Sequence, residues 1–299
     1  MNKPMKQGTG YKIIIHAFFI LVCLSFILPM LMVLSISLED EAGVRAAGYS
    51  LFPREFSLEA YRLAFANPQK MLNAYAVTIG QAVLGTALSC LIAGMVAYPL
   101  SRSGFAYKRG VTFIVFFTML FSGGMIPTYI IYTRWYGLMN SFLAYLLPGL
   151  AGGAWNTLIL RTFFKGLPES LFESAKIDGA GEIRIFFRIA LMLSKPVFAT
   201  ISFIMLVSKW NDWYTSLLYI TRQELYTLQY LLQRILNETQ FLNSMMANSI
   251  PGMNTGAFAR PLETYRFALC VLAAGPMLFI FPFFQKYFAK GMVIGAVKG

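Results

Sequence analysis

Apolar residues gather along this chain in six long runs, and shorter polar segments separate the runs. A helix rises about 1.5 Å per residue, so about 20 apolar residues are enough to cross the hydrocarbon core of a bilayer. Each of the six runs has at least that length. The pattern therefore predicts an all-α, polytopic membrane protein with six transmembrane helices, at residues 11–37, 72–100, 111–132, 141–163, 196–220 and 265–288.

Prolines and glycines inside these runs predict local departures from a straight helix. Pro127 is expected to kink the third span, because its ring removes a backbone hydrogen bond. The fourth span contains Pro148, and Gly149 and Gly153 have the GxxxG spacing that allows helices to approach closely. We interpret this glycine pair as a device for packing within the chain.

Polar segments complete the predicted organisation. Residues 1–10 and 289–299 form terminal tails, and residues 11–288 form the transmembrane domain. Two long polar segments interrupt that domain, at 167–195 and 221–262. The second is rich in Gln, Asn and Thr and is longer than most loops in compact domains, so we expect it to offer a docking surface.

The composition agrees with a membrane protein. The chain is 57% hydrophobic and only 13% charged, whereas soluble domains contain about 25% charged residues. Cys23, Cys90 and Cys270 all lie in apolar runs, where small hydrophobic residues are expected. His16 has no acid–base partner nearby in sequence, and no cysteine–histidine cluster exists. No metal site is therefore predicted.

The basic residues predict the orientation. With a cytoplasmic N-terminus, one side of the membrane carries both tails and the segments after the second and fourth spans. That side holds 15 basic and 4 acidic residues, whereas the other side holds 10 and 9. The positive-inside rule then makes both termini and the 167–195 segment cytoplasmic. The net charge of +12 is explained by these short loops, so a nucleic-acid partner is not predicted.

The segment 167–196 has an unusual pattern for a loop between spans. Pro168 and Glu169 suit the first turn of a helix, where a missing N–H costs nothing and a carboxylate meets the positive end of the dipole. Gly179 ends that helix, because glycine accepts a left-handed cap, and a second helix begins near Glu182. A membrane protein that exposes such a compact, partly apolar element usually offers it to a partner.

Several residues of this segment resemble the EAA loop of ABC importer permeases, whose pattern is Glu-Ala-Ala, three residues, Gly, nine residues, Ile-x-Leu-Pro. The positions that match in register are Glu173, Ala175, Gly179, Ile189 and Leu191. Ser174 replaces the middle Ala, and Met192 replaces the usual Pro, so the second helix is expected to run on unkinked at Met192. The C-terminal sequences 285–291 and 295–299 also resemble sugar permeases.

This resemblance implies the membrane-spanning subunit of a maltose-transporter-like ABC importer in the cytoplasmic (inner) membrane of a prokaryote. Its cargo would be a sugar, which we interpret as an oligosaccharide. The implied partners are a second, homologous permease in a heterodimer, two ATPase subunits, an extracytoplasmic solute-binding protein and membrane lipid. ATP and Mg²⁺ would bind to the ATPase subunits, and this chain would carry no cofactor.

The resemblance also implies that the first helix of the segment docks into a groove on the ATPase. The residues that would form this contact are Leu171, Phe172, Glu173, Ala175, Asp178 and Gly179. The alternative is a loop helix whose charged residues are simply solvated.

Two groups of polar and aromatic residues inside the spans suit a sugar, which offers both hydroxyls and an apolar ring face. They are Trp155 and Asn156 in the fourth span, and Trp210, Asn211, Asp212 and Tyr214 in the fifth. Asp212 is costly in hydrocarbon, so it is expected to face a cavity, a partner or the membrane surface. Core packing remains the alternative for the first group, and an aromatic belt for the second.

Sequence motifs of catalysis are missing. No GxxxxGK[ST], GxSxG or HExxH is present, so no ATP-binding or catalytic residue is predicted and the energy for import must come from another polypeptide. A secondary, ion-coupled transporter remains the alternative function. Such a protein should contain a mid-span carboxylate and inverted repeats; Asp212 is the only candidate carboxylate, and no repeat is visible.

Overall fold

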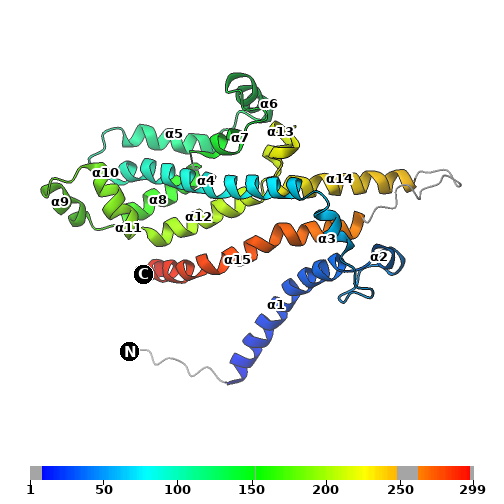
Figure 1. The fold of residues 1–299 in the computed structure, drawn as a ribbon. Coiled ribbons are helices and arrows are strands. Elements are labelled where there is room, and N and C mark those ends of the chain that lie inside the picture. Colours follow the sequence, from blue (N-terminus) through cyan, green and yellow to red (C-terminus); the bar gives the residue numbers. More distant parts are fainter. Residues whose placement is uncertain (1–8, 152, 248–261, 297–299) are drawn as a thin grey trace. The chain divides into compact units, whose positions relative to one another are not determined.

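The computed structural model describes residues 9–151, 153–247 and 262–296, and the chain within them is almost wholly helical (Figure 1). In this described part, the only strand-like feature is a single bridge between Glu39 and Phe56. The chain divides into two units, which are Met1–Pro68 with Arg234–Gly275, and Gln69–Gln233 with Pro276–Gly299.

The first unit joins the N-terminal helices to the start of the last helix. It contains α1 (Thr9–Ser37), α2 (Glu41–Ala47), α3 (Glu59–Ala64) and the beginning of α15 (Leu262–Ala296). The carboxylate of Glu41 accepts hydrogen bonds from the backbone N–H and the hydroxyl of Thr264, both at 2.9 Å. The first N–H groups of a helix have no partner within it, so Glu41 acts as a distant cap that ties α2 to α15.

The second unit is built around one long helix, α4 (Pro68–Ser101). The other elements are α5 (Lys108–Leu120), α6 (Met125–Ile130), η1 (Ile131–Trp135), α7 (Leu143–Leu146), η2 (Leu147–Gly149), α8 (Ala154–Lys165), α9 (Glu169–Ile177), α10 (Glu182–Ile185), η3 (Phe186–Ala190), α11 (Leu191–Leu193), α12 (Lys195–Trp210), α13 (Tyr214–Tyr219), η4 (Gln223–Leu225) and the rest of α15. Helix α14 (Leu228–Ala247) begins in this unit and continues into the first from Arg234. Small residues on α4 let α8 and α12 pack closely. Ala93 and Ala97 are fully buried, and a Cβ at Gly94 would lie only 2.6 Å from the Phe198 ring.

Five of the six predicted spans match candidate spans by length and composition, whereas the fifth candidate covers Glu182–Leu193 and Lys195–Trp210 rather than residues 196–220. Three helical segments are long and apolar enough to cross a membrane without interruption, at Lys12–Ser37, Pro68–Ser101 and Glu263–Gln285. Three more candidates are pairs of helices with a bend between them of 111°, 51° and 83°. The fold is therefore a polytopic, all-α membrane protein with up to six spans.

The third span is broken rather than kinked at Pro127. Helix α5 ends at Leu120, and α6 begins at Met125 after Gly124, whose φ of +86° is a conformation that glycine adopts readily. Pro127 lies in the first turn of α6, where its missing N–H would have had no helical partner. The predicted kink at Pro127 is wrong, because the glycine break upstream reorients the chain by 111°.

The fourth span is also interrupted. Gly149 lies in η2, and Gly153 precedes α8 with a φ of +74°, so the two glycines do not share a helix face. The GxxxG spacing is therefore not a helix–helix motif here. Packing within the chain does involve Gly149, because its carbonyl accepts a 2.7 Å hydrogen bond from the hydroxyl of Ser89 on α4.

Three further segments differ in detail from the sequence patterns. The second helix of the 167–195 segment is helical through Met192, as expected, and then turns by 83° beside Ser194. The polar segment 221–262 contains η4 and the 20-residue helix α14, and its residues 248–261 lie outside the described part. Residues 289–296, expected as part of a tail, continue α15.

Candidate functional site

The 167–195 segment folds as a short helix, a glycine turn and a second helix, which confirms the sequence prediction. Pro168 precedes α9, and Glu169 occupies its first turn. Helix α10 then begins at Glu182 and continues through the wider turn η3 to α11. The helix α9 and the turn after it lie at one end of the second unit (Figure 1).

Gly179 has the left-handed conformation that its position predicts, with a φ of +76°. Its N–H donates to the carbonyl of Lys176 at 3.0 Å, and the N–H of Ala180 donates to that of Ala175 at 2.9 Å. These two bonds form a Schellman cap, which satisfies carbonyls at the end of α9. A Cβ at Gly179 would meet nothing within 4 Å, so backbone conformation alone favours glycine there.

Phe172 points inward rather than toward a partner. It is 2% exposed, and its ring lies 6.2 Å from that of Tyr98 on α4. Ala175 is half-buried against the same core. The proposed role of Phe172 as a direct ATPase contact is therefore wrong, because a short amphipathic helix must bury one face to hold its position. Phe172 anchors α9 to the membrane domain instead.

Arg102 packs on Phe172 and fixes its position, although the sequence patterns did not single out this arginine. The residue is only 8% exposed, and its guanidinium lies 4.0 Å from the centre of the Phe172 ring. Its Nη2 donates to the carbonyl of Phe164 at the end of α8, and its Nε donates to Ser101. Glu169 lies 4.0 Å from Nη1. The available signal was an arginine directly after the long apolar run of α4.

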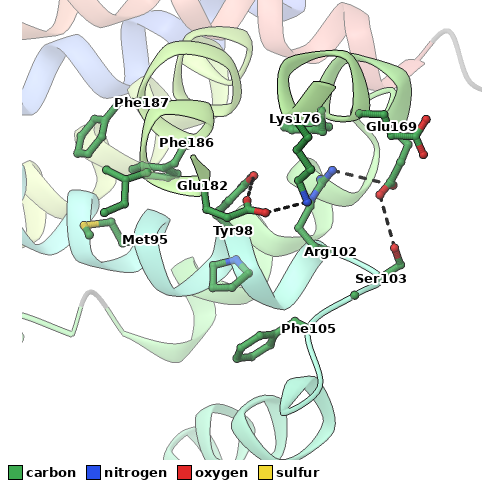
Figure 2. A pocket seen from close by; sticks show the side chains of 15 residues that line it. Met95, Tyr98, Arg102, Ser103, Phe105, Glu169, Lys176, Glu182, Phe186 and Phe187 are labelled. Atoms are coloured by element: carbon green, nitrogen blue, oxygen red, sulfur yellow. Dashed lines mark hydrogen bonds and ion pairs between the residues drawn. The ribbon is translucent and has the colours of Figure 1, made fainter. Parts of the chain in front are cut away.

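A pocket of about 560 Å³ lies between the end of α4, α9 and η3, and Figure 2 shows Arg102 and Lys176 facing its acidic residues. The ammonium of Lys176 is 2.7 Å from Glu182, which also accepts a 2.8 Å hydrogen bond from the hydroxyl of Tyr98. The hydrogen bond from Lys176 is the main cause that lowers the pKa of Glu182. These bonds therefore stabilise the segment at neutral pH and are lost as acid protonates Glu182.

The opposite side of the same segment carries side chains that the membrane domain does not cover. Leu171, Ile177 and Ile183 are 43%, 86% and 74% exposed. Glu173 and Asp178 are exposed beside them, and among the described residues the Glu173 side chain has no hydrogen bond or ion pair. The surface combines apolar groups with unpaired carboxylate charge. We call these five residues the outer face of the α9 segment.

The predicted substrate-path residues have different surroundings. Trp210 is 2% exposed and so forms part of the core, whereas Trp155 is 63% exposed. Tyr214 is 45% exposed and donates a hydrogen bond to the sulfur of Met125. Asn211 is exposed and accepts from the amide of Gln229 at 3.2 Å. Asn156 is half-buried on α8.

Asp212 lies in the break between α12 and α13, where it caps the second helix. Its carboxylate accepts from the N–H of Thr215 at 3.0 Å and from the hydroxyl of Thr215 at 2.6 Å. Because both oxygens have these local partners, the geometry explains an acidic residue here without a sugar. Asp212 lies at a helix N-terminus, where a carboxylate is stabilising.

Asp212→Ala should lower stability without changing the choice of substrate. Loss of a side-chain cap costs about 1 kcal/mol, and Asp212→Asn should retain most of this free energy because its amide oxygen still accepts from Thr215. The thermal midpoint of the purified protein in detergent measures the difference. Equal melting of all three proteins, with altered transport in Asp212→Ala, would instead assign Asp212 to the substrate path.

The described residues include no group of three or more His, Cys, Asp or Glu side chains arranged to hold a metal ion.

The model of one protein family, described as the binding-protein-dependent transport system inner membrane component, matches residues 71–294. The chain belongs to this family. It is an inner-membrane permease of an ABC transporter. The match includes the α9 segment and almost all of the second unit.

Relatives resemble this permease over nearly their full lengths. The polygalacturonan/rhamnogalacturonan transport system permease YtcP of Bacillus subtilis is 38% identical, over 97% of this chain and 98% of that protein. Protein LplC of Bacillus subtilis is 40% identical over 91% and 90% of the two chains. A chain in the crystal structure of a bacterial ABC transporter involved in importing the acidic polysaccharide alginate is 26% identical, with a TM-score of 0.77 over 96% and 100% of the chains.

Proposed function

We propose that this permease is one of two membrane-spanning subunits of an ABC importer that carries oligosaccharides. The similarity to YtcP, which extends over almost the whole of both chains, supports a sugar as the cargo. An arabinooligosaccharide permease of Bacillus subtilis is also similar, at 26% identity over the full length of both chains. Alginate is acidic whereas arabinose units carry no acid group, so the relatives leave the charge of the sugar open.

The complex that we propose contains a second, homologous permease, two ATPase subunits and an extracytoplasmic solute-binding protein. The family description supports the binding protein, because transport in this family depends on one. Helix α5 has no buried residue in the isolated chain, which leaves an apolar surface for the second permease or for lipid. ATP and Mg²⁺ would be held by the ATPase subunits, and this chain would transmit their motion.

The outer face of the α9 segment is the surface that we assign to the ATPase. Ile177 and Ile183 expose apolar area that a partner would remove from water. Glu173 would supply a charge contact from the same face. Phe172 and Arg102 would connect this docking surface to α4, so that a movement of α9 would be transmitted to this membrane-spanning helix.

Reconstitution of the complete complex in liposomes tests the proposed function. Radiolabelled oligosaccharide should accumulate only when ATP, the binding protein and both permeases are present. A complex that imported with a proton or sodium gradient and no ATP would be a secondary transporter instead. ATP-driven import of amino acids or metal ions, but not oligosaccharides, would contradict the assigned cargo.

The orientation gives a separate prediction. Cysteine introduced for Ile177 on α9 should be protected from an impermeant maleimide in intact cells, whereas cysteine for Gln240 on α14 should be labelled. Both positions are exposed in the isolated chain. Because the proposed ATPase contact would also cover Ile177, the labelling should be done in cells that lack the ATPase subunits, and permeabilisation should then make Ile177→Cys reactive. The background should lack the native residues Cys23, Cys90 and Cys270. The reverse labelling pattern would overturn the orientation and place α9 outside the cell.

A further inference from the structure

Lys209 places a charged group at the middle depth of the membrane domain. It lies near the end of α12, and its backbone carbonyl accepts a hydrogen bond from Gln81 on the neighbouring α4 (Figure 1). The Lys209 side chain runs along α4 to Gly85, one turn beyond Gln81. Its Cδ lies 2.9 Å from the position that a Cβ would occupy at Gly85. Gly85 is at the centre of the 34-residue helix Pro68–Ser101. The ammonium therefore points toward mid-membrane, not toward the nearer surface.

In the part of the chain that the structure describes, no acidic side chain forms an ion pair with this charge, and Asp212 attracts it only at longer range. The ammonium of Lys209 has no carboxylate within 4.0 Å there and no hydrogen bond. Asp212 is three residues away, but both of its oxygens bind Thr215. An ammonium group without a directly bonded counter-charge is costly in hydrocarbon, so it should face a partner or a water-filled cavity.

A second feature at the same depth indicates a cavity. The Nζ of Lys209 lies 2.9 Å from the site of a Cβ on Gly149, at the end of η2. The fourth span is interrupted there, between η2 and α8, with a bend of 51°. Non-helical backbone at membrane depth occurs where it is buried in protein or lines a water-filled cavity. Interrupted spans commonly mark substrate sites in transporters.

We propose that Lys209 binds a carboxylate of the sugar as it passes through the membrane domain, which makes acidic oligosaccharides the substrate class. This inference rests on the proposed function as an oligosaccharide importer. Asn211, two residues after Lys209, is exposed and accepts a hydrogen bond from the half-buried Gln229, so this amide pair offers polar groups for sugar hydroxyls. An ammonium for the acid group and amides for the hydroxyls match the chemistry of a uronic acid.

Two substitutions alter the charge and its position separately. Lys209→Met removes the ammonium but keeps an unbranched stem of similar length between Gly85 and Gly149. Gly85→Ala keeps the ammonium but displaces it, because the new Cβ would lie 2.9–3.0 Å from the end of the lysine side chain. Lys195→Met is the matched control, because it removes an exposed positive charge from the other end of α12.

The measurement is binding to the assembled permease–ATPase complex in nanodiscs, without the binding protein, so that selectivity of the binding protein does not enter. The probes are trigalacturonate and its fully methyl-esterified form, which has the same rings but no charge. Wild type and Lys195→Met should bind the acid more tightly than the ester. Lys209→Met and Gly85→Ala should lose about tenfold in affinity for the acid, equivalent to about 1.4 kcal/mol, and little for the ester.

Other outcomes would overturn the inference. Equal loss for acid and ester, or no loss for either, would assign Lys209 to packing. Failure of Lys209→Met to co-purify with the second permease would make Lys209 a subunit contact. If neither probe bound the wild-type complex and no other oligosaccharide stimulated its ATP hydrolysis with the binding protein present, the proposed function itself would fail. That result differs from wild-type binding of the neutral ester alone, which would contradict only the role of Lys209.

Discussion

Gly179→Val is expected to abolish ATP-driven import while leaving the permease inserted and assembled with the second permease that we propose. Gly179 is left-handed, at a φ of +76°, and this conformation costs an L-residue about 1–2 kcal/mol, with β-branched residues the least tolerant. To relieve that strain the chain must give up the two hydrogen bonds that cap α9. The cost therefore falls on the outer face of the α9 segment and not on the spans.

Two variants control for this effect. Gly179→Asn should retain most coupling, because Asn tolerates the left-handed region. Gly181→Val changes a glycine two positions away whose φ of −71° suits any residue and whose Cβ would also meet open space. The measurements are co-purification of the ATPase and substrate-stimulated ATP hydrolysis in reconstituted membranes. Normal coupling in Gly179→Val would show that this turn does not transmit the ATPase motion.

Arg102→Met is expected to release α9 from the membrane domain. It removes a charged donor from the carbonyl of Phe164, which keeps the N–H of Leu167 at 3.3 Å, and a hydrogen bond to a charged group contributes about 1.5–3 kcal/mol. It also removes the guanidinium from the face of Phe172, which contributes about 0.5–2 kcal/mol. A local loss of about 2 kcal/mol corresponds to roughly thirtyfold more frequent opening. The ATPase should still bind the outer face but should drive import poorly.

Hydrogen exchange measures that release directly. Amides of α9 should exchange roughly thirtyfold faster in Arg102→Met, whereas those in the middle of α4 should not change. Arg109→Met is the matched control, because Arg109 is exposed near the start of α5. Unchanged exchange in α9 would mean that its packing does not depend on Arg102, and equal acceleration throughout α4 would indicate general unfolding.

The sequence by itself determined the membrane character, the approximate spans and the position of the α9 segment. Apolar runs of this length have to be buried in lipid or protein, so hydropathy alone reveals them. Glycine at 179 could also be interpreted locally, because a helix cap depends on the conformation of one residue and its neighbours. The outcome for Pro127 shows the limit of local interpretation. The chain breaks at the nearby glycine, so Pro127 lies in the first turn of α6, where a proline does not kink the helix.

Tertiary structure alone decided which face of each helix is inside. Phe172 follows the same helical pattern as Leu171, yet Phe172 is buried under Arg102 whereas Leu171 is half-exposed. In the sequence, Lys209 is likewise only a lysine next to several aromatic residues. The structure shows that its side chain lies against Gly85 on α4 and Gly149 in η2. These contacts join residues that are far apart in the chain. Burial and charge compensation depend on the neighbours that packing supplies, and no pattern within one helix specifies them.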